Sequence, residues 1–139
     1  MSFVVDTSVA LAWCFEDEQT QPVMNLLDRV TQTGAIAPSL WPLEALNALL
    51  MAERKKRLDS EHRQRLAGFL RELPITLDTE TAEHAWTTTA RLAERYRLTL
   101  YDAAYLELAQ RRRVPLATLD KDLIKAGKAL GIQLVGTGA

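Results

Sequence analysis

The sequence predicts an α/β fold: a short parallel β-sheet of four to five strands with helices on both faces. Short apolar runs alternate with longer amphipathic segments along the whole chain, which is typical of strands linked by crossover helices. These short runs are continuously apolar, as expected for strands covered on both faces. A length of 139 residues with 47% hydrophobic residues suits one core, so we assign residues 1–139 to a single domain.

In the first half of the chain, element boundaries follow residues that begin or end helices. Gly34 ends the second helical pattern, and Pro42 suits the first turn of the third helix. Asp59 or Ser60 caps the fourth helix, which Pro74 breaks. We therefore expect strands at residues 3–5, 35–37 and 75–77, and helices at residues 9–15, 20–33, 42–57 and 60–73.

The second half of the chain alternates in the same way. Thr99 and Asp102 have the spacing of a capping box, which marks the start of a helix. Asp120 opens the last helix, and Gly131 follows its end. We therefore expect helices at residues 81–96, 103–111 and 120–130, and strands at residues 116–118 and 132–135.

Several large side chains are expected in the core. The third helix carries an apolar stripe at helical spacing, formed by Leu43, Leu46, Leu49 and Leu50. The three tryptophans are assigned to the core or to an interface rather than to a base-stacking platform; they are Trp13, Trp41 and Trp86. The single cysteine, Cys14, is expected to be a small core residue.

Composition excludes several classes of protein. One cysteine forms no internal disulfide, and together with two histidines it provides no Cys/His cluster spaced for zinc. The sequence does not begin with a basic segment and a long apolar stretch, and no later apolar run reaches a membrane-spanning length. We therefore expect a cytoplasmic protein without membrane contact.

The basic residues are clustered although the net charge is only −1. Each cluster complements the dipole at the end of a predicted helix, or lies along a helix, and needs no further role. Together the clusters permit an anionic substrate without demanding one. They comprise residues 54–57, residues 111–113, and the set Lys121, Lys125 and Lys128.

Four acids lie where ligands bind in folds of this type. Asp6 follows the first strand and Asp120 follows the strand at residues 116–118, while Glu44 and Asp102 lie in the first turns of helices. The connections after parallel strands meet at one edge of the sheet, so the four side chains should converge. Taken one at a time, each acid is better explained by capping a helix N-terminus, which requires no convergence.

Convergence of carboxylates has a chemical consequence. Acids gathered in one cleft repel each other and raise each other's pKa unless a cation compensates them. Oxygen ligands without thiolates or paired imidazoles suit Mg²⁺ or Mn²⁺. Such an ion can activate water for phosphodiester hydrolysis, and the chain carries no glycine-rich phosphate loop and no nucleophile elbow.

The acids occur within four short segments of the chain. These are Val4-Val5-Asp6-Thr7-Ser8, residues 37–47 (APSLWPLEALN), residues 100–105 (LYDAAY) and residues 116–120 (LATLD). In this order and spacing, over nearly the whole chain, they resemble the PIN-domain ribonucleases, most closely the small VapC-type toxins of toxin–antitoxin pairs. All four acidic positions match the pattern of that family.

The resemblance implies roles for particular residues. Asp6, Glu44, Asp102 and Asp120 would bind the metal ion and organise the attacking water. Neighbouring polar residues could orient these carboxylates, although local capping or turn formation explains Thr7, Ser8 and Thr118 equally well. Asp122 could act as an outer acid, although a solvated acid in the first turn of a helix explains it better. These neighbours are Thr7, Ser8, Asn47, Thr118 and Asp122.

The resemblance also implies a function and partners. It implies an endoribonuclease toxin that hydrolyses RNA with Mg²⁺, or with Mn²⁺ as a substitute, and is inhibited by a small VapB-like antitoxin. It further implies a homodimer, with contact to DNA only through the antitoxin. A housekeeping RNA-processing nuclease would share the chemistry, and a catalytically silent protein-binding module would share only the fold. A phosphoacceptor receiver domain matches less well, since Thr7 follows Asp6 and Gly136 follows the last strand.

Overall fold

The computed structural model describes residues 2–136, and it contains one five-stranded parallel sheet. The strand order is β3-β2-β1-β4-β5, and every neighbouring pair is parallel. All five predicted strand positions are confirmed, although the observed strands are short. They are β1 (Val4–Val5), β2 (Ala35–Ala37), β3 (Ile75–Leu77), β4 (Leu116–Ala117) and β5 (Leu134–Val135).

Helices follow the predicted order between these strands. Before β3 lie α1 (Thr7–Cys14), the short 3₁₀ turn η1 (Glu16–Glu18), α2 (Gln21–Thr33), α3 (Trp41–Arg54) and α4 (Ser60–Glu72). After β3 lie α5 (Thr81–His84), the π-helical segment η2 (Ala85–Thr89), α6 (Ala90–Tyr96), α7 (Leu100–Arg112) and α8 (Lys121–Ala129). The predicted α/β class with a single parallel sheet is therefore confirmed.

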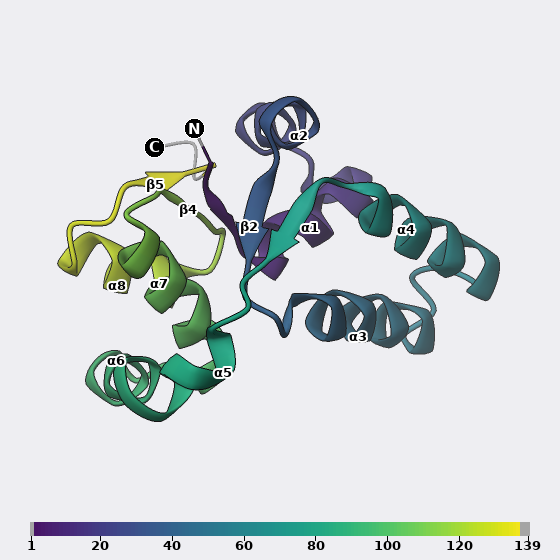
Figure 1. Ribbon diagram of the computed structural model, residues 1–139. Coiled ribbons are helices and arrows are strands. Elements are labelled where there is room, and N and C mark those ends of the chain that lie inside the picture. Colours follow the sequence, from purple (N-terminus) through teal and green to yellow (C-terminus); the bar gives the residue numbers. More distant parts are fainter. Residues whose placement is uncertain (1, 137–139) are drawn as a thin grey trace.

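The helices divide into two groups around the sheet. α1 packs against α2 and α3, and α3 packs against α4, whereas α7 packs against α6 and α8. Because parallel crossovers are right-handed, the path from β1 to β3 places the first group on one face, and the return to β4 places the second group on the other. Figure 1 shows this division, with α7 and α8 on one side of the strands and α3 and α4 on the other.

Local sequence signals explain where the helices begin. Side-chain oxygens of Thr20, Asp59, Thr99 and Asp120 accept hydrogen bonds from backbone N–H groups in the first turns of α2, α4, α7 and α8. Each cap satisfies an amide that the helix itself leaves unpaired. Asp59 rather than Ser60 is the N-cap of α4.

The core lies between the sheet and the two groups of helices. Its largest fully buried side chains include Tyr105, Phe3, Leu49, Leu106, Leu108, Leu116 and Leu123. Cys14 belongs to the core as predicted, and burial raises the pKa of its thiol to about 11. The Trp13 indole is also buried and donates a hydrogen bond to the Val23 carbonyl oxygen over 2.8 Å.

The apolar stripe predicted for α3 is not the face that the core covers. Leu43 is 75% exposed and Leu46 is 47% exposed, although Leu49 is fully buried. The buried face instead consists of Trp41, Ala45, Leu49 and Ala52. Alanines on this face allow α3 to lie close to its neighbours, and the larger leucines are left on the solvent side.

The helix expected at residues 81–96 is interrupted by the π-helical segment η2. Such segments insert an extra residue and rotate the helix faces that follow. Within η2, Thr89 is buried whereas Trp86 is 88% exposed, so Trp86 is not part of the core, and its assignment to an interface stays a prediction.

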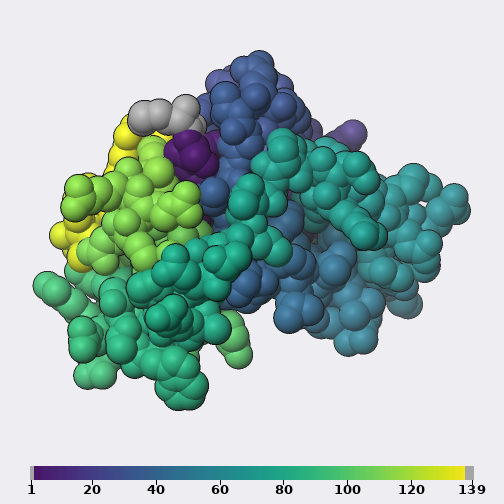
Figure 2. All heavy atoms as spheres, in the orientation of Figure 1, coloured from purple at the N-terminus to yellow at the C-terminus, as the bar shows by residue number. Residues whose placement is uncertain are grey.

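Two groups of helices project from the body of the molecule. Figure 2 shows α5 and α6 on one side and α3 and α4 on the other, with an indentation between them at the lower edge of the view. No helix formed by residues 2–136 has the length and apolar character needed to span a bilayer.

Candidate active site

The candidate site lies at the carboxyl ends of β1 and β4. These two strands are neighbours, and the chain order reverses there because β2 and β3 extend the sheet in one direction while β4 and β5 extend it in the other. Val5 pairs with Ala117, so the residues that follow, Asp6 and Thr118, lie side by side. This is the position at which parallel sheets of this type bind ligands.

Asp6 is held by hydroxyl groups from two elements. Ser8 Oγ donates a hydrogen bond to Asp6 Oδ2 over 2.7 Å, and Thr118 Oγ1 donates to the same oxygen over 2.8 Å. Burial raises the pKa of the Asp6 carboxyl, although these two hydrogen bonds oppose the rise, and the charge of Glu44 adds to it. Thr118 Oγ1 also accepts a hydrogen bond from the Asp120 backbone N–H, over 3.0 Å.

Glu44 is held in the same manner by α1 and α7. Tyr105 donates its hydroxyl hydrogen to Glu44 Oε1 over 2.6 Å, and Thr7 Oγ1 lies 3.1 Å from the same oxygen. The hydroxyls of Thr7 and Tyr105 are themselves 2.8 Å apart. Glu44 Oε2 has no hydrogen-bond partner among residues 2–136, so one oxygen of this carboxylate is fixed and the other is available.

Asp102 connects the acids electrostatically. It lies in the first turn of α7, and its backbone N–H donates to Thr99 Oγ1 over 3.1 Å. Burial raises the pKa of the Asp102 carboxyl, and the charges of Asp6 and Asp120, and more weakly that of Asp122, raise it further. Charges alter a neighbour's pKa only at short range, so the carboxylates of Asp6, Asp102 and Asp120 lie near one another.

The predicted residues are not equally well placed. Asp6, Glu44, Asp102 and Asp120 are linked by charge, and Thr7, Ser8 and Thr118 make the side-chain hydrogen bonds described above. Asp120 also caps α8, because Asp120 Oδ2 accepts a hydrogen bond from the Leu123 N–H over 2.9 Å. Asn47 is exposed and makes no side-chain hydrogen bond within the described part of the chain. Its role beside Glu44 stays a prediction.

The chemistry of the donors fits a hard divalent ion. The four acids offer carboxylate oxygens, and no Lys, Arg or His within residues 2–136 forms an ion pair with any of them. Their arrangement is not a ready-made cage, since the described residues contain no group of three or more His, Cys, Asp or Glu side chains close enough to hold a metal ion. Binding would therefore require the side chains to move closer together.

Tyr105 is the site residue that the sequence did not identify. Its side chain is fully buried. It lies three residues after Asp102 on α7, a spacing that places two side chains on one face of a helix. That spacing could have indicated Tyr105, but its contact with Glu44 joins residues 61 positions apart.

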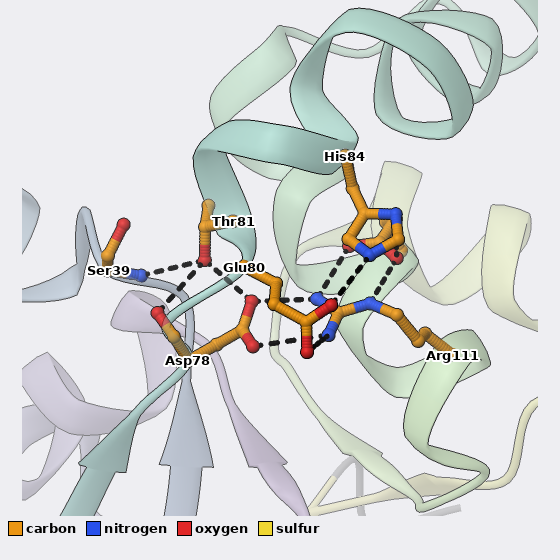
Figure 3. A network of polar contacts seen from close by, with 7 residues as sticks. Ser39, Asp78, Glu80, Thr81, His84 and Arg111 are labelled. Carbon is orange, nitrogen blue, oxygen red and sulfur yellow. Dashed lines mark hydrogen bonds and ion pairs between the residues drawn. The ribbon is translucent and has the colours of Figure 1, made fainter.

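A second acidic cluster, which we call the Arg111 network, lies beside α5 (Figure 3). Arg111 donates hydrogen bonds to Asp78 over 2.7 and 3.1 Å and to Glu107 over 2.7 and 3.1 Å. Thr81 Oγ1 donates to Asp78 Oδ2 over 2.8 Å and accepts from the Ser39 N–H over 3.1 Å. The network also contains Glu80 and His84, whose carboxylate and imidazole are 3.5 Å apart.

Arg111 compensates the buried acids of this network. Burial would raise the pKa of Asp78, but hydrogen bonds from Arg111 and Thr81 outweigh it and lower the pKa. Hydrogen bonds with Glu107 and Asp78 raise the pKa of Arg111. Arg111 therefore forms structural ion pairs that join α7 to the connection between β3 and α5, and it is not available to an anionic substrate.

Comparison with known proteins identifies relatives of this fold. A family profile described as the PIN domain matches residues 3–129. No curated protein matches the sequence significantly. Among solved structures, PAE2754 from Pyrobaculum aerophilum has 25% sequence identity and a TM-score of 0.67, and the alignment covers 99% of this chain and 85% of that one.

Two further solved structures share the fold at lower sequence identity. VapBC2 from Rickettsia felis, bound to a DNA fragment from their promoter, aligns with 12% identity and a TM-score of 0.61, covering 96% of this chain and 97% of that one. VapC20 from Mycobacterium tuberculosis, a sarcin–ricin loop cleaving toxin, aligns with 16% identity and a TM-score of 0.60, covering 90% and 95%.

Proposed function

Since the chain belongs to the PIN domain family, whose members are generally nucleases, we propose that it is an endoribonuclease dependent on Mg²⁺ or Mn²⁺. The observation that carries this proposal is a chain of neighbouring acids at the β1/β4 edge, in which Glu44 raises the pKa of Asp6, and Asp6 and Asp120 raise the pKa of Asp102. Asp102 and Asp6 both have raised pKa values there, and no protein cation within residues 2–136 pairs with either acid. A divalent ion from solution is the compensation that the donor set fits.

The four acids would contribute to metal binding in different ways. Asp6 and Glu44 are each hydrogen-bonded at one oxygen by groups from two different elements, which limits the rotation of both carboxylates. Asp102 and Asp120 lie at the starts of α7 and α8 and approach from the other strand connections. When bound, a divalent ion would lower the pKa of a water molecule and offset charge that develops on the phosphodiester.

The test is cleavage of a mixed RNA pool by purified protein with Mg²⁺, with Mn²⁺ and with EDTA. Cleavage should require a divalent ion. Asp6→Asn should lower the cleavage rate by at least about 100-fold, because loss of a group that only orients a metal ligand already lowers activity by up to about that factor. Asp28→Asn, at an exposed position on α2, is the matched control and should cleave at the wild-type rate. Equal cleavage by wild type and Asp6→Asn would contradict the proposed site.

We further propose that the nuclease is a toxin that a small VapB-like antitoxin inhibits, and that it acts as a homodimer touching DNA only through that antitoxin. The similarity to VapBC2 and VapC20 supports this, as do large apolar side chains exposed on α3, η2 and α7. Exposed apolar residues of this kind are common at protein–protein interfaces. They are Leu43, Leu46, Trp86, Leu100 and Tyr101.

Expression in a bacterial host separates the toxin from a housekeeping nuclease. Induction of the wild-type chain should stop growth, whereas Asp6→Asn, expressed to the same level, should not. Normal growth with abundant, RNA-cleaving wild-type protein would favour the housekeeping alternative. Light scattering on the purified protein tests the homodimer, and a monomeric mass at micromolar concentration would contradict it.

A further inference from the structure

The structure assigns Tyr105 a role beyond packing: we infer that its hydroxyl, together with that of Thr7, fixes Oε1 of the Glu44 carboxylate and leaves Oε2 free to bind the metal ion. This inference rests on the proposed function, because it concerns how the same site binds its ion. Tyr105 is thus a positioning residue that acts through Glu44.

The protons of the three groups determine how the contacts are made. Tyr105 has one hydroxyl hydrogen, and the 2.6 Å separation from Glu44 Oε1 identifies the carboxylate as its acceptor. The Thr7 hydroxyl then donates either to Glu44 over 3.1 Å or to Tyr105 over 2.8 Å. In both arrangements every hydrogen bond that Glu44 accepts from residues 2–136 falls on Oε1, and Oε2 keeps its lone pairs.

The position of Tyr105 makes this restraint rigid. The side chain is fully buried, so its ring has no freedom to move away from Glu44. Tyr105 and Asp102 share one face of α7, and Thr7 follows Asp6 at the start of α1. The hydroxyl contacts therefore connect the starts of α1, α3 and α7. A site acid lies at each of these starts: Asp6 is the N-cap of α1, and Glu44 and Asp102 lie in the first turns of α3 and α7.

A packing role alone does not account for the hydroxyl. A phenylalanine ring would fill the same space, and a buried hydroxyl is costly unless it finds a partner. Here the partner is the carboxylate of Glu44, which lies in the first turn of another helix, α3. Mutation of a group that orients a metal ligand commonly lowers metal affinity or activity by about 10–100-fold.

The experiment compares Tyr105→Phe with wild type. Calorimetric titration with Mn²⁺, in the absence of RNA, should show an affinity about 10–100-fold weaker for the variant. In RNA cleavage, the Mg²⁺ concentration at half-maximal rate should rise by a similar factor, while the rate at saturating Mg²⁺ should fall less. Thermal unfolding of the metal-free proteins reports any loss of structure separately.

Matched controls keep the outcomes distinct. Tyr96→Phe removes the hydroxyl of a partly buried tyrosine on α6 and should leave Mn²⁺ affinity unchanged. If Tyr105→Phe does not fold, Thr7→Val removes the other hydroxyl, and its Mn²⁺ affinity should be several-fold weaker on the same physical grounds. Equal Mn²⁺ affinity of the folded variant and wild type would overturn the role of Tyr105 alone. Wild-type protein that binds no Mn²⁺ and cleaves no RNA would overturn both this inference and the proposed function.

Discussion

The candidate active site and the Arg111 network are both acidic clusters near the carboxyl ends of strands, but their charges are balanced in opposite ways. In the network, Arg111 pairs with Asp78 and Glu107, and the pKa of Asp78 is lowered. In the site, no protein cation within residues 2–136 pairs with Asp6 or Asp102, and both pKa values are raised.

This difference distinguishes a structural acidic cluster from the one that we propose binds a metal ion. An ion pair satisfied within the protein stabilises the fold but cannot bind anything else. Carboxylates left without a cation destabilise the fold at neutral pH, yet they are ready to bind a cation from solution. The absence of an internal cation, more than the number of acids, therefore supports our proposal that the β1/β4 edge is the active site.

The largest expected effect comes from removing the cation of the network. Arg111→Leu should lower the free energy of unfolding by about 3–5 kcal/mol, because it leaves buried carboxylates without a partner. Urea unfolding without divalent ions measures the loss. Arg112→Leu, in the same helical turn but exposed, should change the value by less than about 0.5 kcal/mol. Similar unfolding midpoints for the two variants would mean that the network is not a stabilising unit.

Addition of Mg²⁺ should stabilise the protein through the candidate active site and not through the Arg111 network. At a Mg²⁺ concentration about 100 times the dissociation constant, wild-type protein should gain about 2.7 kcal/mol of stability. Asp102→Asn should lose most of this gain, whereas Arg111→Leu should keep it if the variant folds. Urea unfolding with and without Mg²⁺ tests this, and an undiminished gain in Asp102→Asn would exclude Asp102 as a ligand.

Removing one charge from the site should stabilise the metal-free protein. Asp102→Asn removes a carboxylate whose ionised form is disfavoured by burial and by Asp6 and Asp120. We expect a gain of about 0.5–1 kcal/mol after allowance for screening by solvent, together with loss of RNA cleavage. Thermal unfolding in EDTA measures the gain, with Asp28→Asn as the neutral control. A loss of stability would show that Asp102 acts mainly as a helix-capping acid.

The smallest expected change is in the pH dependence of stability. The pKa of Asp78 is lower in the folded protein than the ordinary value of about 3.9, so its contribution to stability is present above that value and is lost as the pH falls through the folded pKa. The stability difference between wild type and Asp78→Asn should therefore be constant near neutral pH and shrink below about pH 4. Urea unfolding between pH 7 and pH 3 follows it. A difference that does not decrease at all between pH 7 and pH 3 would contradict the ion pair with Arg111.

Much of the fold was predictable because its signals are local. Helix starts at Asp59, Thr99 and Asp120 depend on hydrogen bonds within one turn, and these caps are observed. The positions of the strands were likewise predictable from short apolar runs. The face of α3 that is buried was not, because its leucines and alanines both have helical spacing, and only the closeness of neighbouring elements selects the alanine face.

The sequence by itself determined the order of strands and helices and placed acids at the strand ends, since periodicity, caps and prolines act over a few residues. Tertiary structure alone decided which polar atoms meet. The Tyr105–Glu44 contact joins residues 61 positions apart, and the Arg111–Asp78 contact joins residues 33 positions apart. Periodicity reports which side of a helix is buried, but the partner of a buried hydroxyl or guanidinium depends on how separate elements pack.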